Sequence, residues 1–344
     1  MRSVFYENIM QECLGVLAAA RSMHSIIPLT APAIRRRHTQ KAIEPLLGIG
    51  KRTAALLLAA GVAMVLLLHS PVSVAAGGYE IPPFRNAVLD ETAAEGNSEA
   101  IVDMSHVNEG YVAMRCVSDV KIKFQVLIDD LTFTYSVVTG ADQIFPLQCG
   151  SGHYIFKVMK NIEDKKYAEL YKCEADVQLA DPFDPFLRPS QYANYSESSE
   201  CVQMARSMAE AADTQEDFIN SVYTFVCDTV RYDQEKAQTV QSGYLPVPDE
   251  TMNTGKGICF DYASLAASML RSQGVPTQII FGYVAPDDIY HAWNKFYSEE
   301  NGWMLAEFTV SGPDWNRVDL TFSANGASDQ FIGDGSNYME AYTY

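Results

Sequence analysis

Between residues 101 and 179 the apolar residues fall in short runs in which apolar and polar positions alternate, and the runs are rich in Val, Ile, Tyr and Phe. A period of two is typical of half-buried β-strands. Glycines and an Asp-Lys pair separate the runs as turns. The pattern predicts a β-sandwich-like domain over residues 101–180. Its expected strands are 102–117, 120–128, 131–138, 154–159 and 167–177.

Residues 199–344 follow a different pattern. Apolar residues recur at helical spacing in 199–212, in 214–230 and again from Cys259 until Gly274-Val275-Pro276 ends the helix. Strand-like runs follow at 278–284, 291–297 and 315–322. This order predicts a second domain, over 199–344, in which a helix packs on an antiparallel sheet. The fold class is therefore α+β. The proline-rich segment 181–198 is expected to be a linker whose Phe183, Phe186 and Leu187 hold the two domains together.

Residues 1–78 are expected to be a leader. Residues 53–68 are uncharged and apolar, a basic stretch precedes them, and Ser73-Val74-Ala75 resembles a small-residue cleavage site. This layout fits a signal peptide or an uncleaved membrane anchor, and the two alternatives stay open. Either one places most of the protein outside the cytoplasm, secreted or anchored to the membrane. Residues 79–100 are expected to be a linker.

The candidate chemistry begins at Cys259, which opens the predicted helix after a glycine-broken loop. The first turn of a helix favours a thiolate, which is the nucleophilic form of cysteine. His291 is the only histidine after His153, and it lies near the start of a predicted strand. Asp319 lies on the next predicted strand. Two neighbouring strands would place this carboxylate beside the imidazole, as a Cys-His-Asp triad requires.

Three stretches resemble the transglutaminase-like superfamily, in its secreted or membrane-anchored bacterial form. They are Gly257-Ile258-Cys259-Phe260-Asp261-Tyr262-Ala263 with the helix that follows, Tyr290-His291-Ala292-Trp293-Asn294, and Val318-Asp319-Leu320-Thr321-Phe322. The resemblance covers residues 200–344. It implies a papain-like core in which Cys259, His291 and Asp319 are catalytic.

The spacing between the histidine and the acid is longer than the family's usual short turn. An insertion, residues 299–314, contains Trp303 and Glu307. Glu307 lies nearer the family's usual distance from the histidine, whereas the residues around Asp319 match the family strand better. We therefore expect Asp319 to be the acid, with Glu307 as the alternative.

Composition narrows the possible partners. The net charge is −18, which argues against nucleic acid as a partner because its phosphates would repel this surface. The seven cysteines show no CxxC pair and no zinc spacing, and we find no phosphate loop or nucleotide fingerprint. No metal or cofactor is expected. Disulfide pairing among Cys116, Cys149 and Cys173 stays open.

The predicted function is thiol acyl transfer, in which Cys259 attacks a carboxamide or peptide carbonyl and His291 transfers the proton. Cross-linking, deamidation and peptide hydrolysis all use the same residues. The expected partner is a protein or peptide substrate, for example a cell-wall or surface protein, with the membrane contacted only through an uncleaved leader. The Cys259 N–H is a natural oxyanion donor, and Tyr244 is a candidate for a second. The alternative is an extracellular binding or scaffold protein that keeps the fold without catalysis.

Overall fold

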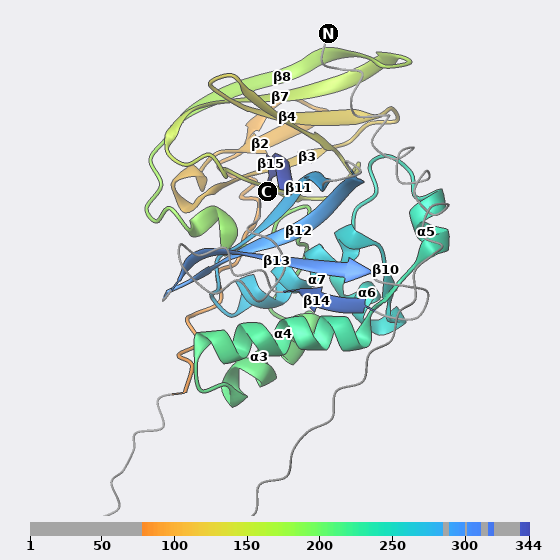
Figure 1. Cartoon of the computed structure of the whole chain (residues 1–344). Helices are drawn as coiled ribbons and strands as arrows, with labels where there is room; N and C mark the ends of the chain where they lie inside the picture. The colour runs from red at the N-terminus through yellow and green to blue at the C-terminus, as the bar shows by residue number, and fades with distance from the viewer. Residues whose placement is uncertain (1–77, 285–288, 300, 311–315, 320–337) are drawn as a thin grey trace, which may run out of the picture. The chain divides into compact units, whose positions relative to one another are not determined.

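The computed structural model describes residues 78–284, 289–299, 301–310, 316–319 and 338–344 (Figure 1). The predicted leader, including its apolar segment 53–68, lies outside the described residues apart from Gly78. Among the described residues, no helix is both long and apolar enough to cross a membrane.

Two four-stranded antiparallel sheets make up the first part of the described chain. One has the order β1-β2-β3-β6 and the other β5-β4-β7-β8. The strands of the first are β1 (Glu95–Gly96), β2 (Ala100–Asp103), β3 (Tyr111–Cys116) and β6 (Gln143–Pro146). Those of the second are β4 (Ile122–Ile128), β5 (Leu131–Ser136), β7 (Gly152–Glu163) and β8 (Lys166–Val177).

Side chains from the two sheets meet in a shared core. Along β4 the residues are alternately buried and half-buried, as the period of two predicts. Phe124 of β4 lies 4.6 Å, ring centroid to ring centroid, from Phe145 of β6 in the other sheet. One predicted strand is wrong: residues 102–117 form β2 and β3, separated by the 3-10 helix η3 (Val107–Glu109). Gly110 ends η3 with a φ of 87°, a left-handed conformation that interrupts the strand.

The helical part begins after a short 3-10 helix, η4 (Asp184–Phe186). Helices α3 (Glu200–Ala211) and α4 (Gln215–Thr229) lie close to their predicted bounds. Two shorter helices follow, α5 (Gln234–Thr239) and α6 (Pro248–Thr254), and then α7 (Cys259–Ser272). The two-residue strands β9 (Arg231–Tyr232) and β10 (Lys256–Gly257) pair in parallel just before α7.

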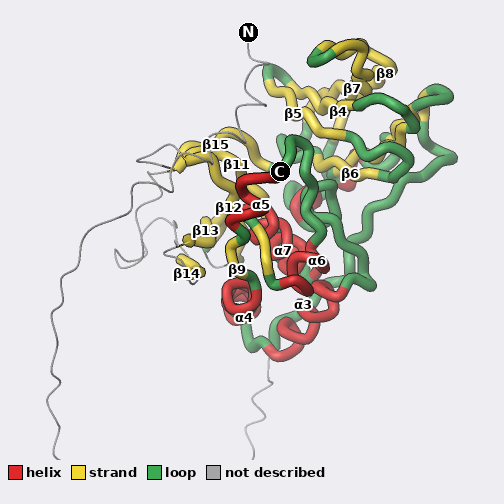
Figure 2. The backbone as a smooth tube through the Cα atoms, turned by 90° about the vertical axis from the view of Figure 1, so that its right-hand side faces the viewer, coloured by secondary structure: helices red, strands yellow, loops and turns green. Residues whose placement is uncertain are grey.

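A five-stranded antiparallel sheet faces these helices, with the order β14-β13-β12-β11-β15. Its strands are β11 (Thr277–Val284), β12 (Ile289–Ser298), β13 (Gly302–Val310), β14 (Asn316–Asp319) and β15 (Tyr338–Thr343). Figure 2 shows α3, α4, α6 and α7 gathered on one side of this sheet. The segment 299–314, expected to be an insertion, contains β13. The strands of His291 and Asp319 are therefore not neighbours.

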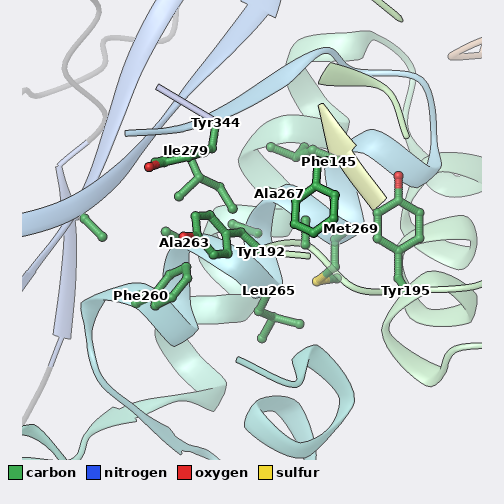
Figure 3. Close-up of a cluster of buried hydrophobic side chains, with 14 of the residues drawn as sticks. Phe145, Tyr192, Tyr195, Phe260, Ala263, Leu265, Ala267, Met269, Ile279 and Tyr344 are labelled. Atoms are coloured by element: carbon green, nitrogen blue, oxygen red, sulfur yellow. The ribbon is translucent and has the colours of Figure 1, made fainter. Parts of the chain in front are cut away.

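Helix α7 is the centre of the core. Every residue from Phe260 to Ser272 is buried, and three alanines among them let the sheet approach closely. Figure 3 shows Tyr192 beside Phe260 and Ala263 of this helix, and Tyr344 beside Ile279. Tyr344 also lies 5.4 Å, ring to ring, from Tyr135 of β5. The first two sheets and the helical part therefore share one core, and the described residues from Gly78 onwards belong to one compact unit.

Candidate active site

Cys259 occupies the first position of α7 and is half-buried. The chain reaches it through Gly255, which ends α6 with a φ of 62°, and through β10. Ile258, with extended backbone, precedes the helix. The glycines therefore deliver the cysteine to a helix start, as the sequence predicted. At this position the positive end of the helix dipole favours the thiolate.

A buried carboxylate lies two residues further on. Asp261 is fully buried, and its Oδ2 accepts a hydrogen bond of 2.8 Å from the backbone N–H of Ile258. The Lys236 ammonium of α5 lies 2.8 Å from the same oxygen. Oδ1 accepts a hydrogen bond from the Tyr244 hydroxyl. Gly257 makes room for this carboxylate, because a Cβ at that position would lie 2.6 Å from the Asp261 Cβ.

This network changes the role expected of Tyr244. Its hydroxyl donates to Asp261 and accepts a 2.6 Å hydrogen bond from Lys236 Nζ. Burial raises the pKa of Tyr244, and the hydrogen bond to Asp261 raises it further. The hydroxyl proton is held by the carboxylate, so nothing in this arrangement supports Tyr244 as an oxyanion donor. Asp261 and Lys236 were missed in the sequence. An acid three residues after the residue that precedes a helix is a capping signal that could have revealed Asp261.

His291 lies on β12, opposite Gly282 of β11. The residue is half-buried, its Nε2 atom is enclosed, and its ring lies 6.5 Å from that of Trp293. Burial lowers the pKa of His291 to about 4. The imidazole is therefore neutral at pH 7, which is the form that accepts a proton.

Contacts along α7 follow β12 in order and bring Cys259 and His291 to the same end. Near the helix start, Phe260 lies 4.8 Å, ring to ring, from Phe281, which pairs with Ala292. One turn later, Asn294 Nδ2 donates a 3.1 Å hydrogen bond to the Ala263 carbonyl oxygen. At the far end of α7, Arg271 Nε donates a 2.7 Å hydrogen bond to the carbonyl oxygen of Thr277. Thr277 pairs with Phe296 of β12.

The two faces of the sheet differ. Ala292 and Phe296 belong to the core that contains α7, whereas Trp293 forms a separate buried cluster with Ile280 and Leu305. Since side chains alternate along a strand, His291 is on the same face of the sheet as Trp293, and Ala292 is on the opposite face. Trp293 itself is fully buried.

Residues 202–308 match the family model of the transglutaminase-like superfamily. These residues therefore carry a transglutaminase-like core domain. A curated protein of Methanocaldococcus jannaschii, named a UPF0252 protein, is 31% identical over 62 residues, which are 17% of this chain. The chain spans 18% of that relative's length.

Comparison with solved structures gives partial matches with low TM-scores. The periplasmic domain of TgpA from Pseudomonas aeruginosa is 12% identical, with 66% of this chain and 75% of that chain covered and a TM-score of 0.30. Red sea bream transglutaminase is 12% identical, with 57% of this chain and 47% of that chain covered and a TM-score of 0.24. LapG of Legionella pneumophila is 15% identical, with 42% of this chain and 82% of that chain covered and a TM-score of 0.26.

The acid of the transglutaminase-like core has two candidates on different strands. Glu307 lies on β13, directly after Ala306, which pairs with Asn294 of the histidine strand. Asp319 lies on β14 and pairs with Glu307. Strand β13 thus separates Asp319 from β12, contrary to the neighbouring strands expected from the sequence. The family match includes Glu307 and ends before Asp319. The backbone of both residues is described, but their side chains lie outside the description.

The other cysteines of the described chain differ in their exposure to solvent. Cys201 and Cys227 are buried, and no disulfide joins the cysteines that the structure describes. Cys149 is exposed and lies in the turn before β7. Within the described ranges, no group of three or more His, Cys, Asp or Glu side chains could hold a metal ion.

Proposed function

We propose that the protein is a thiol acyl-transfer enzyme with Cys259 as nucleophile and His291 as general base. The observation that carries the proposal is the order of contacts between α7 and β12, which brings the two residues to the same end of the transglutaminase-like core. We infer that the His291 imidazole and the Cys259 thiol meet at that end.

The chemistry follows from these positions. Cys259 Sγ attacks the carbonyl carbon of a carboxamide or peptide, while neutral His291 takes the thiol proton. The first N–H groups of a helix bind anions, so the Cys259 N–H would stabilise the oxyanion. His291 then gives its proton to the leaving ammonia or amine. The thioester that remains reacts with an amine, giving a cross-link, or with water, giving deamidation or hydrolysis.

We propose Glu307, rather than Asp319, as the acid that orients His291. Strand β13 lies next to β12, and β14 lies on the far side of β13. Because neighbouring strands are about 5 Å apart, the backbone of Asp319 on β14 is about 10 Å from β12. An aspartate side chain is too short to cross an intervening strand, whereas Glu307 belongs to the strand adjacent to β12. The end of the family match at residue 308 supports the same choice.

We further propose a protein or peptide substrate met outside the cytoplasm. The support is the apolar segment 53–68 with its basic flank, which is typical of an export signal or an anchor. The acidic composition argues against nucleic acid. To separate the reaction outcomes, the full chain is incubated with a glutamine-containing protein and a labelled amine. Label incorporation marks cross-linking, ammonia without label marks deamidation, and new N-termini mark hydrolysis.

Iodoacetamide labelling at pH 7 tests the nucleophile, with Cys149 as the internal reference for a thiol whose pKa is raised, by partial burial and by Asp129. If exposure alone sets the rate, exposed Cys149 reacts faster than half-buried Cys259. If Cys259 is activated, it reacts about tenfold or more faster than Cys149, and His291→Ala abolishes that advantage. Mass spectrometry of tryptic peptides gives both rates in one sample.

A catalytically silent scaffold is the second candidate. The observation in its favour is that strand alternation places His291 with Trp293, on the face opposite α7. In that case Cys259 reacts no faster than Cys149, and His291→Ala leaves both rates unchanged. The labelling experiment therefore decides between the two functions.

A further inference from the structure

The start of α7 contains a closed set of three polar side chains that the proposed chemistry does not use. Lys236 Nζ lies 2.8 Å from Asp261 Oδ2 and 2.6 Å from the Tyr244 hydroxyl oxygen, and Tyr244 donates to Asp261 Oδ1. Lys236 Nζ also lies 4.5 Å from the centre of the Tyr244 ring. Asp261 is fully buried, while the Lys236 side chain retains 30% of its exposure.

A second connection ties Lys236 to the chain just before Cys259. Asp233 caps α5, because its Oδ1 accepts a 2.8 Å hydrogen bond from the backbone N–H of Lys236. The backbone N–H of Asp233 donates a 2.9 Å hydrogen bond to the carbonyl of Gly257. The segment that delivers the lysine is therefore fixed to the residue that precedes Ile258. Lys236 and Asp261 are therefore held at the same helix start as Cys259.

The charge of Asp261 has a consequence for its neighbour. A carboxylate in the first turn of the helix opposes formation of a second anion two residues away, because like charges raise the pKa of an acid. Burial strengthens this repulsion, since the local dielectric constant is low. The Lys236 ammonium compensates the carboxylate at contact distance, which leaves the dipole of α7 as the local field on the thiol.

The geometry points to Lys236 as a positioning residue that neutralises Asp261 and so lets Cys259 ionise, with Tyr244 holding the carboxylate in place. This inference rests on the proposed function of Cys259 as nucleophile. Lys236 touches no reacting atom in this scheme. It acts through Asp261 on the charge around the sulfur.

The other charged and titratable groups around this turn do not replace Lys236. Besides Asp261 and Tyr244, they are Asp233, whose carboxylate caps α5, and Glu250 of α6, which acts electrostatically on Tyr244. His291 of β12, at the same end of the core, is kept neutral at pH 7 by burial. Lys256 of β10 is exposed. Among these described groups, Lys236 alone is a cation in contact with the Asp261 carboxylate.

The test is the pH dependence of Cys259 alkylation in the full chain, with iodoacetamide as the probe. In Lys236→Met and in Lys236→Gln the midpoint rises by about one pH unit, which is about tenfold slower labelling below the midpoint. Lys236→Arg keeps the cation and stays within about twofold of the unsubstituted protein. The double variant Lys236→Met with Asp261→Asn removes both charges and returns the midpoint to its original value.

Thermal unfolding and the labelling rate of Cys149 report whether each variant is folded. A lower melting temperature with an unchanged midpoint would mean that Lys236 is only structural, and this result overturns the inference. Failure of both uncharged single variants to fold overturns it as well. Failure of the proposed function looks different: Cys259 of the unsubstituted protein would then react no faster than Cys149 and would not depend on His291.

Discussion

Asn294 of β12 donates a hydrogen bond to the backbone carbonyl of Ala263 in α7, with a nitrogen–oxygen distance of 3.1 Å. The same nitrogen donates to the carbonyl of Gln278 in β11 at 3.2 Å. Asn294 is fully buried. The side-chain amide of Asn294 therefore joins three elements: α7, which begins at Cys259, β12, which carries His291, and the adjacent strand β11.

Replacing Asn294 by alanine leaves the Ala263 and Gln278 carbonyls without this buried donor. We expect the free energy of unfolding to fall by about 2–3 kcal/mol, the usual cost of breaking hydrogen bonds in a core. Urea unfolding followed by circular dichroism gives the value. Gln125→Ala is the control, because Gln125 makes one long side-chain bond on a half-buried strand position. Equal losses in the two variants would contradict the linking role of Asn294.

Gly257→Ala tests the close approach of Asp261 to the chain before the helix. The added Cβ would lie 2.6 Å from the Asp261 Cβ, which forces the carboxylate or the backbone to move. We expect a loss of about 1–3 kcal/mol in unfolding free energy, typical of overpacking, together with slower alkylation of Cys259. In Gly78→Ala the new Cβ meets only an ordinary contact of 3.5 Å, so this variant should keep full stability.

Glu307→Gln and Asp319→Asn form a matched pair for the acid. Each change removes a charge and keeps the shape of the side chain. We expect Glu307→Gln to lower acyl transfer by about a hundredfold or more, because the histidine loses the group that orients it. Asp319→Asn should keep activity within about threefold. The reverse order of effects would place the acid on β14 instead of β13.

The burial of His291 predicts a specific loss of stability at acid pH. Its pKa is lowered from 6.5 to about 4, so above pH 6.5 the ring is neutral in both the folded and the unfolded chain. Between pH 6.5 and 4 the unfolded chain binds a proton that the folded chain excludes, and stability falls as the pH falls. The full difference is about 3 kcal/mol.

Comparison with His291→Gln isolates this effect, because every other titrating group is common to both proteins. We expect the stability difference between the two proteins to be constant above pH 6.5. Between pH 6.5 and pH 4 the unfolding free energy of the unsubstituted protein should fall relative to that of the glutamine variant. Urea unfolding at pH 7.5, 5.5 and 4.5 measures it. A constant difference across all three values would mean that His291 titrates as an exposed histidine.

Local patterns in the sequence predicted most of the elements around the site. The glycines before Cys259 and the apolar spacing after it predicted the start of α7, and the helices 199–212 and 214–230 were found within one or two residues. These signals lie within a few turns of chain, where backbone preference and burial of one face decide the outcome. The strand predicted at 102–117 failed because the polar turn that contains η3 and ends at the left-handed Gly110 divides the segment into two strands.

Order across the sheet could not be predicted in the same way. Residues 299–314 were expected to be an insertion between two neighbouring strands, and they contain β13 instead. Both arrangements bury alternate apolar residues, so the pattern does not distinguish them. The Lys236–Asp261 contact joins residues that are 25 positions apart, through a loop whose path the sequence does not specify.

The sequence by itself determined that a cysteine opens a buried helix and that a histidine lies on a later strand, because both depend on local spacing. Only the tertiary structure decided which acid strand adjoins the histidine strand and which cation compensates Asp261. Strand order and contacts between distant side chains depend on how whole elements pack, and many packings satisfy the same local pattern.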